Sequence, residues 1–434
     1  MQHKKISRRS VLQGGAALAA AAALAGCGAK QTAASGAQFA TSASSASHET
    51  KPDKEPLPTP DGLPMTQYRA MWVSYLDWAL IDFSGEDAFR ASAGAMLDNC
   101  KAMGLNTVIA QVRPFGDALY RSSLFPWSHL CTGTQGQDPG FDPLDVLVTE
   151  CHDRALSLEA WVNPYRLRLN EKTPAAFADT SLAVTHPEWC VTVEQGMYLN
   201  PAIAEAADYV VQGVEEIVEG YAVDGVHFDD YFYPTTDAGV DASQYAASGS
   251  ADDLDTWRRA NVTRLVKNAH NAVKAKDPTL RFGISPQGNP DNNYSQQYSD
   301  VNAWISPESG DALVDYICPQ LYWGYHYTLK SGSDRFAYEN ISAEWASLPR
   351  LDAVRLYFGL GAWRIGDGDG GANSDAVSQW NSGENLAAMI RDLKALEVDG
   401  YALFRYASLF DSAYPDVAAA ECAAITTANA EETA

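Results

Sequence analysis

The sequence predicts an α/β protein with a (β/α)8 barrel of the TIM type. Eight short apolar runs alternate with amphipathic stretches over most of the 434 residues, and this alternation is typical of a parallel sheet with crossover helices. Polar and aromatic residues gather directly after the runs, where such a barrel carries its active site. The alternative is a doubly wound open sheet, but no glycine-rich phosphate loop follows any of the runs.

The eight strands are expected at the apolar runs, in chain order. They cover residues 70–75, 107–112, 158–163, 225–230, 281–285, 316–322, 355–360 and 401–406. Helices are expected where apolar residues recur at helical spacing, over residues 84–103, 143–155, 201–220, 252–275 and 384–396. Asn200 and Pro201 suit a helix cap followed by a proline at the first helical position.

The N-terminus has the features of an export signal. Residues 7–12 (SRRSVL) resemble a twin-arginine signal, and the apolar segment 11–26 is too short to span a bilayer stably. Residues 24–27 (LAGC) resemble a lipobox, in which cleavage before Cys27 leaves that cysteine to be lipidated. The alternative is an uncleaved N-terminal anchor. Either way, the body is expected on the extracytoplasmic face of the cell membrane, tethered to it.

These patterns divide the chain into four parts. Residues 1–26 are expected to be the signal peptide, and residues 27–66, rich in Ala, Ser, Thr, Pro and Lys, a flexible tether. The barrel is expected over residues 67–415. Residues 416–434 are expected to form a C-terminal tail that frays from about Thr426.

The formal net charge of −24 limits the partners of the protein. The first 26 residues hold four basic side chains and no acidic one, so the rest of the chain is more acidic still. Such a body repels phosphate backbones, which argues against nucleic acid and against a basic patch for anionic lipid.

Six cysteines follow Cys27 without zinc-site spacing. They can form disulfides in an exported protein or stay as buried thiols, and the sequence leaves both open. No metal site is expected from these cysteines.

Polar and aromatic side chains follow seven of the eight predicted strands. Aromatic rings stack on the C–H faces of sugars, whose hydroxyls bond to amide, guanidinium and carboxyl groups. The strand ends are therefore expected to bind a glycan through Arg113, Asp117, Asn163, Tyr165, His227, Tyr231, Gln287, Gln320, Tyr322, Trp323, Trp363 and Arg405. The same ends carry Arg166 and Arg364, to which no separate role is assigned. For Arg113 and Arg405, the alternative is a buried ion pair that holds the barrel mouth.

Asp229 and Asp230 are the catalytic candidates. Side chains alternate along a strand, so His227, Asp229 and Tyr231 are expected on the inward face of the run 225–230. Asp229 is therefore the better placed carboxylate. Asp230 lies where the strand gives way to a loop, so it either turns toward the cleft or caps the loop. His227 lies deeper and is expected to orient Asp229.

A glycosidase needs a proton donor near the leaving oxygen and usually a second carboxylate. Asp229 is expected to be one of the two. The sequence leaves its partner open among Asp230, Asp117, Glu308 and Asp77.

The strand ends resemble those of a family of bacterial lipoproteins, glycosyl-hydrolase-like family ten. The similar stretches are MWVSYLDW (71–78), NTVIAQVRPFGDALYRSSLFPWS (106–128), EAWVNPYRL (159–167), DGVHFDDYFYP (224–234), RFGISPQGN (281–289), DYICPQLYW (315–323), YFGLGAWRIG (357–366) and GYALFRYASL (400–409). The family includes a divisome-associated glycosidase that acts on peptidoglycan glycans stripped of stem peptides. The resemblance implies a TIM barrel in the cell envelope, glycan hydrolysis without a cofactor, and partners in the cell wall or division machinery.

A more distant similarity is to DGxDxDxE, the strand-four motif of family 18 chitinases. With Asp224 and Gly225 aligned, His227 and Asp229 take the places of the second and third aspartates. Tyr231 then stands where that family has its catalytic Glu. The general acid of that family is not carried over, which disfavours a substrate-assisted mechanism, although an N-acetylated substrate remains consistent.

The sequence therefore predicts an envelope-anchored glycosidase that cleaves a β-linked amino-sugar glycan, with peptidoglycan strands as the substrate that the resemblance implies. The alternative from another class is a tethered glycan-binding barrel without activity, which the missing Glu at Tyr231 favours. A metal-dependent deacetylase is a third hypothesis, and it lacks a convincing set of ligands.

Overall fold

The computed structural model describes residues 57–58, 64–65, 67–373 and 376–431. The predicted signal peptide, Cys27 and most of the predicted tether lie outside the described residues. Within the predicted tether, β1 (Leu57–Pro58) and β2 (Pro64–Met65) form a short antiparallel ladder. Met65 is buried inside the barrel. The predicted C-terminal boundary of the tether is therefore too late, because these residues already belong to the folded body.

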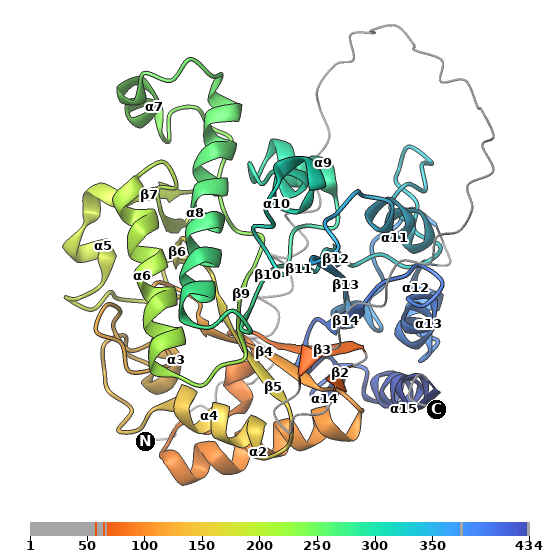
Figure 1. Cartoon of the computed structure of the whole chain (residues 1–434). Helices are drawn as coiled ribbons and strands as arrows, with labels where there is room; N and C mark the ends of the chain where they lie inside the picture. Colours follow the sequence, from red (N-terminus) through yellow and green to blue (C-terminus); the bar gives the residue numbers. More distant parts are fainter. Residues whose placement is uncertain (1–56, 59–63, 66, 374–375, 432–434) are drawn as a thin grey trace, which may run out of the picture. The chain divides into compact units, whose positions relative to one another are not determined.

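Eight parallel strands close into a barrel, which confirms the predicted fold class (Figure 1). The strands follow one another around the barrel in chain order, and the last pairs with the first through Leu403 and Met71. They are β3 (Tyr68–Val73), β4 (Thr107–Arg113), β5 (Ser157–Val162), β9 (Gly225–Phe228), β10 (Arg281–Ile284), β11 (Tyr316–Ile317) continued by β12 (Gln320–Leu321), β13 (Arg355–Leu360) and β14 (Gly400–Leu403).

The sixth strand is split where the sequence predicts one run. Both of its parts pair with β13, and Cys318 and Pro319 lie between them. Proline has no N–H to give to a strand ladder, so the pairing stops there.

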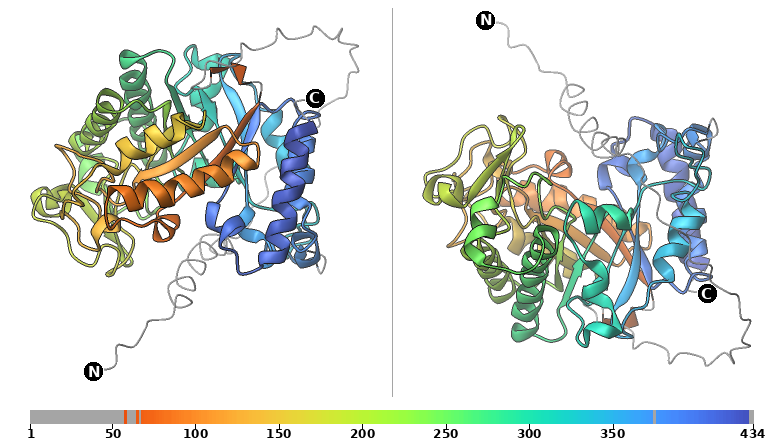
Figure 2. Two further views of the ribbon diagram at one scale, coloured as in Figure 1. Left: turned by 90° about the horizontal axis from the view of Figure 1, so that it is seen from below. Right: turned by 90° about the horizontal axis from the view of Figure 1, so that it is seen from above.

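Helices cover the outside of the barrel, as the alternation predicts (Figure 2). The larger ones are α2 (Glu86–Ala102), α4 (Pro143–His152), α6 (Ala204–Gly220), α8 (Leu254–Lys276), α11 (Tyr338–Ala346), α13 (Asn385–Asp392) and α15 (Pro415–Glu431). Shorter ones are α9 (Pro290–Ser295), α10 (Val301–Ile305), α12 (Ala376–Trp380) and α14 (Tyr406–Phe410). Pairs such as α6 with α8 and α13 with α15 pack against each other.

The prediction that α6 begins at Pro201 is wrong. Asn200 accepts a hydrogen bond from the N–H of Ala202 in a local turn, and its amide donates to the carbonyl of Val240. Because both groups of the Asn200 side chain are engaged elsewhere, the helix begins only at Ala204.

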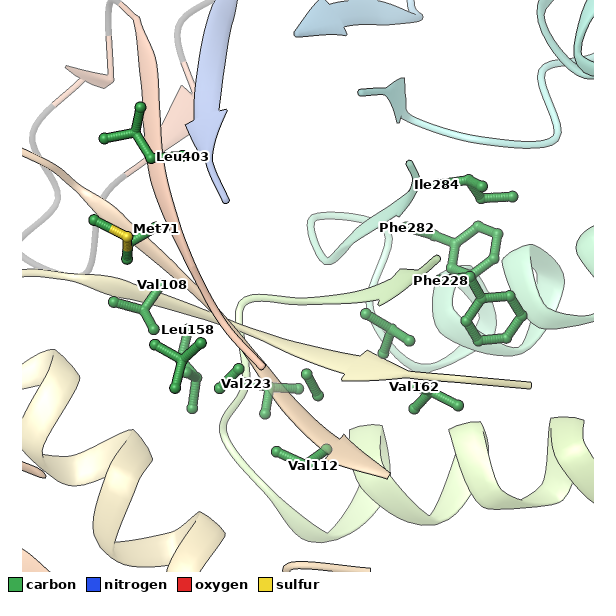
Figure 3. Packing of buried hydrophobic residues seen from close by; sticks show 14 of the residues in the cluster. Met71, Val108, Val112, Leu158, Val162, Val223, Phe228, Phe282, Ile284 and Leu403 are labelled. Carbon is green, nitrogen blue, oxygen red and sulfur yellow. The ribbon is translucent and has the colours of Figure 1, made fainter. Parts of the chain in front are cut away.

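The core has two layers, because successive side chains of a strand face opposite ways. Phe228, Phe282, Val162 and other side chains of the outer layer pack between the strands and the helices (Figure 3). The inner layer fills the barrel and is largely aromatic, with Tyr68, Trp72, Trp161, Tyr316 and Tyr357. This inner filling is a packed core and not a channel.

The expectation that the chain frays from about Thr426 is wrong up to Glu431. The helix α15 buries Ile425 and Ala428. Its Asn429 donates to the carbonyl of Met103 at 2.7 Å and accepts from the hydroxyl of Tyr401 at 2.8 Å. The Ala-rich composition that suggested a tail instead suits a helix that packs closely on the barrel.

Two insertions at the C-terminal ends of the barrel strands are not predicted by the sequence. A three-stranded antiparallel sheet of β6 (Arg166–Arg168), β7 (Cys190–Val193) and β8 (Gly196–Leu199) lies between β5 and α6. The helix α7 (Ala242–Ser248) lies between β9 and α8. Both insertions follow the C-terminal ends of barrel strands, so they extend the loops that surround the site.

All six cysteines of the described residues are free thiols, and Cys100, Cys131, Cys151 and Cys318 are buried. The question that the sequence left open is thus answered in favour of thiols. In the part of the chain that the structure describes, no helix combines the length and the apolar character needed to cross a membrane.

Candidate active site

Asp229 lies just beyond the C-terminal end of β9 and is 3% exposed. One carboxylate oxygen accepts hydrogen bonds from the indole of Trp161 at 3.0 Å and from the amide of Asn163 at 2.9 Å. The other accepts from the N–H of Tyr231 at 3.2 Å. The predicted inward position of Asp229 is confirmed. Asn163 lies directly against it.

Burial and, to a smaller extent, the charge of Asp230 together raise the pKa of Asp229 to about 7. The charge of Arg166 and the hydrogen bonds from Trp161 and Asn163 oppose this rise. A carboxyl group with a pKa near 7 keeps its proton in a large fraction of molecules at neutral pH, so Asp229 can act as a general acid.

Asp230 is 9% exposed and turns across the barrel mouth instead of capping its own loop. Its carboxylate accepts a hydrogen bond from Gln320 at 2.9 Å, and Gln287 also donates to it. Gln320 donates in addition to the carbonyl of Ser285 at 3.0 Å, which keeps the amide in place. Burial raises the pKa of Asp230 as well. Gln287 and Gln320 therefore lie where the sequence predicts them, beside the aspartates.

Arg166 is a cation that lies close enough to Asp229 and Asp230 for its charge to act on both. Its Nε donates to the carbonyl of Pro114 at 3.2 Å. The guanidinium carbon lies 4.9 Å from the ring centre of Phe115, and 5.3 Å from those of Tyr75 and Tyr231. Its charge lowers the pKa of both aspartates. Sequence reasoning placed Arg166 at a strand end but assigned it no role. Its importance could have been inferred from its position, because it is the one cation in the strand-end stretch EAWVNPYRL.

His227 is fully buried below the mouth and does not orient Asp229 by a hydrogen bond, so that expectation is wrong. Its Nε2 accepts from the indole of Trp72 at 3.3 Å, because an indole nitrogen can only donate. Its Nδ1 therefore carries the hydrogen and donates to Tyr316 at 2.8 Å. Burial lowers the pKa of His227 to about 3, so the ring is neutral. It reaches Asp229 only through the ring of Trp161.

Arg113 faces the helices and not the mouth, which corrects its predicted role. The pairing of β4 with β5 shifts between Gln111 and Arg113, so Arg113 lies beside the outward-facing Val162. Its guanidinium lies 4.4 Å from the ring of Phe125 and packs against Gly213 of α6. A bulge that reverses the facing of a side chain leaves no trace in the alternation of the sequence.

Tyr165 is also directed outward and is buried. The charges nearest to it are those of Asp208 on α6 and Arg264 on α8. The proline at position 164 ends the alternation of side chains along β5. The direction of the Tyr165 side chain therefore could not be predicted from the strand.

Arg405 forms the ion pair that the sequence left as an alternative. Its Nη1 donates to Asp77 at 2.7 Å, and Asp77 is buried and also accepts from the backbone of Ser74 and Ala407. Arg405 therefore joins the loops that follow β14 and β3 at the barrel mouth.

The remaining candidates for a second carboxylate are occupied or distant. Asp117 is buried and accepts from His129 at 3.1 Å and from Gln135 at 3.2 Å. Glu308 lies exposed in the turn η3 (Pro307–Ser309), which leads into the N-terminal end of β11, opposite to Asp229. With Asp77 held by Arg405, Asp230 is the acidic group that adjoins Asp229.

Aromatic side chains form the other side of the mouth. Tyr322 stacks on Phe404 with ring centres 5.6 Å apart and meets Trp363 edge-on at 6.1 Å. Tyr231 is 45% exposed, which suits a ring that a sugar can cover. Trp323 stacks instead on Phe336 at 4.9 Å, so it packs between loops.

A cavity of about 720 Å³ lies beside the mouth, between residues 78–84 and residues 130–139. Neither aspartate lines it. Within the described ranges, no group of three or more His, Cys, Asp or Glu side chains is arranged to hold a metal ion.

Comparison with known proteins agrees with this geometry. Residues 67–379 match the model of the family described as "Glycosyl hydrolase-like 10", and residues 5–25 match the twin-arginine translocation signal sequence. The chain is 35% identical to "Glycosyl hydrolase YngK" of Bacillus subtilis over 355 residues, which are 76% of this chain and 66% of that protein. It is 33% identical to "Glycosyl hydrolase DigH" of Escherichia coli K12 over 335 residues, which are 69% of this chain and 74% of that protein.

The chain thus spans just under two thirds of the length of the Bacillus relative. Among solved structures, the catalytic domain of a β-amylase from Paenibacillus polymyxa is similar in fold, with a TM-score of 0.52 and 12% identity. That similarity covers 83% of this chain and 98% of the other. Since the matched family model covers most of the barrel, the chain belongs to the glycosyl hydrolase-like 10 family.

Proposed function

We propose that this protein is an exported glycosidase that cleaves β-linked amino-sugar glycans, and that peptidoglycan glycan strands are its substrate. The observation that carries the proposal is the buried pair Asp229 and Asp230, in which one carboxyl has a pKa of about 7. The pair lies at the C-terminal ends of the barrel strands, where enzymes of this fold act. Family membership and the names of the relatives support glycoside hydrolysis.

In the proposed mechanism, Asp229 gives its proton to the oxygen of the leaving sugar. Trp161 and Asn163 hold the carboxyl in place, so its position is prepared before the substrate arrives. Asp230, held by Gln320 and Gln287, supplies the second carboxylate and stabilises the positive charge that develops at the anomeric carbon as the bond to the leaving oxygen breaks. A water molecule then bonds to the anomeric carbon and gives one proton to the Asp229 carboxylate, which restores the acid. Two adjacent carboxyls resist double ionisation, which favours one shared proton near neutral pH.

The aromatic side of the mouth would hold the sugar ring next to this pair. Tyr231, Tyr322 and Trp363 offer faces and edges to C–H groups, while Gln287 and Gln320 lie beside the aspartates for contact with hydroxyl or acetamido groups.

The test is release of soluble fragments from peptidoglycan glycan strands whose stem peptides have been removed. Wild-type protein is expected to release reducing ends, and the Asp229→Asn variant is expected to bind the glycan without cleaving it. No turnover of these strands or of chitin oligomers by the wild type, together with binding that Asp229→Asn leaves unchanged, would instead support the non-catalytic glycan-binding barrel. The tyrosine at position 231, where an acid was expected, favours that second candidate.

The proposed location is the extracytoplasmic face of the cell membrane, with Cys27 lipidated. The match of residues 5–25 to a twin-arginine signal supports export, and the LAGC sequence that ends at Cys27 supports lipidation. Partners in the cell wall or division machinery are part of this proposal. Mass spectrometry of the membrane fraction is expected to find a lipid on Cys27, and a Cys27→Ala variant is expected to leave that fraction.

A further inference from the structure

Arg166 is a buried cation that forms no direct ion pair in the part of the chain that the structure describes. It is 5% exposed, and within the described ranges no acidic oxygen lies at salt-bridge distance from it. Its Nε is bound to the carbonyl of Pro114, while its two terminal amino groups have no partner among the described residues. Arg258 and Arg281 are buried arginines with an ion pair, to Asp241 and Glu159. Arg113 is buried without one, but it packs against a ring on the helix side of the barrel, whereas Arg166 lies beside the aspartates.

The surroundings of Arg166 hold the guanidinium in one position. Tyr75, Phe115 and Tyr231 come from the loops after three different strands, and their rings lie about the guanidinium at 4.9 to 5.3 Å. These rings displace water from the faces of the cation and leave its amino groups for a ligand. A buried guanidinium that is already fixed loses little conformational freedom when it binds.

We propose that Arg166 binds a carboxylate on the substrate sugar, and so makes the enzyme selective for acidic amino-sugars such as N-acetylmuramic acid with a free lactyl group. A planar guanidinium matches the two oxygens of a carboxylate, and burial strengthens the contact. In the same glycan, a stem peptide converts this carboxylate into an amide, which offers no charge. Arg166 would thereby distinguish glycan without stem peptides from glycan that carries them. This inference rests on the proposed substrate class.

The competing explanation is that Arg166 serves only the aspartates, whose pKa values its charge lowers. The two explanations predict different changes. Loss of a cation that only tunes Asp229 shifts the pH profile for every substrate equally. Loss of a cation that binds the substrate carboxylate removes the preference for acidic sugars at every pH.

The experiment measures binding in the Asp229→Asn background, so that it does not depend on turnover. The ligands are a disaccharide of N-acetylglucosamine and N-acetylmuramic acid, its lactyl methyl ester and chitobiose, and calorimetry gives the affinities. A charge-assisted, two-point contact is expected to favour the free acid over the ester by about ten- to a hundredfold. Arg166→Gln is expected to abolish this ratio, and Arg166→Lys to retain part of it.

Arg168→Gln is the matched control. Arg168 lies on the same strand, β6; its guanidinium lies 4.1 Å from the ring of Phe177, and its Nη2 donates to the carbonyl of Ala175. It is expected to leave the ratio unchanged. Equal affinity of the parent for the acid and the ester would overturn the inference, as would equal losses for both in Arg166→Gln. Should that variant fail to fold, the ratio in the parent protein and in Arg166→Lys decides.

This design separates the inference from the proposed function. A protein that prefers the free acid but never cleaves it refutes hydrolysis and keeps the role of Arg166. A protein that cleaves acid and ester alike refutes the role of Arg166 and keeps hydrolysis.

Discussion

Two buried carboxyl groups on neighbouring barrel strands, Asp229 after β9 and Glu159 within β5, have opposite surroundings. Burial raises the pKa of both. Glu159 is balanced: Arg281 donates to one oxygen at 2.7 Å, and Tyr316 donates to the other. Asp229 stands beside a second carboxyl, and its nearest cation, Arg166, is held by aromatic rings instead of by an ion pair.

The comparison shows that burial of an acid is not by itself a sign of chemistry. The network around Glu159 pairs one negative charge with one positive charge inside a closed core, which holds the strands together. At the mouth, two acids share one cation that retains free hydrogen-bond donors, so the site is completed by a ligand or by a proton. The predictions below test whether this division between a structural acid and a reacting acid is correct.

The largest expected effect is on activity in Asp229→Asn. An amide cannot donate the proton in the reaction, so cleavage of the glycan is expected to fall by about 100- to 10,000-fold. Burial disfavours the charged form of Asp229 in the folded wild type. At pH values above the usual pKa of a carboxyl group, the free energy of unfolding of the variant is therefore expected to equal or exceed that of the wild type. Reducing-end release and denaturant unfolding measure the two. A variant that loses stability but keeps its activity when folded would show that Asp229 is a structural acid like Glu159.

Glu159→Gln is expected to do the reverse. It leaves the buried Arg281 without a counter-charge, so the free energy of unfolding should fall by about 3–5 kcal/mol. The surface variant Glu308→Gln is the control and should change stability by less than about 0.5 kcal/mol. Denaturant unfolding provides the measurement. A Glu159→Gln protein as stable as the wild type would show that the network does not hold the barrel together.

The pH dependence gives a smaller effect that sharpens the comparison. With a pKa of about 7, Asp229 is protonated below pH 7 and loses its proton above it, so activity should decline as the pH rises through about 7. Arg166→Gln removes a charge that lowers this pKa, so the decline should move to higher pH. Rates on an uncharged chitin oligomer measure it, since no substrate carboxylate is present. A shift to lower pH would contradict the assigned proton donor.

Trp161→Phe is expected to have the smallest effect. It removes one hydrogen bond that lowers the pKa of Asp229, and keeps a ring in the barrel core. The expected result is a rise of the upper pKa in the pH profile, with a loss of transition-state stabilisation of about 1 kcal/mol. Trp72→Phe is a matched indole variant whose nitrogen faces His227 instead. It should leave the upper pKa unchanged, and equal shifts in both variants would indicate a general loosening of the core.

Strand alternation correctly placed Asp229 on the inward face, and strand ends correctly placed Asn163, Gln287 and Gln320 beside the aspartates. The same reasoning misplaced Arg113, because the bulge in β4 reverses the facing of its side chain. It also treated residues after Pro415 as a tail, because composition alone does not show that α15 caps the first turn of α13 through Glu421.

The sequence by itself determined the barrel, the positions of its strands and the acidic pair at the end of β9, because the periodicity of apolar residues is local and is present in the chain. The tertiary structure decided which groups meet. The aromatic rings around Arg166 come from three separate loops, and Asp230 meets Gln320 ninety residues away. Contacts of this kind depend on loop conformations and on closure of the barrel, which no local pattern encodes.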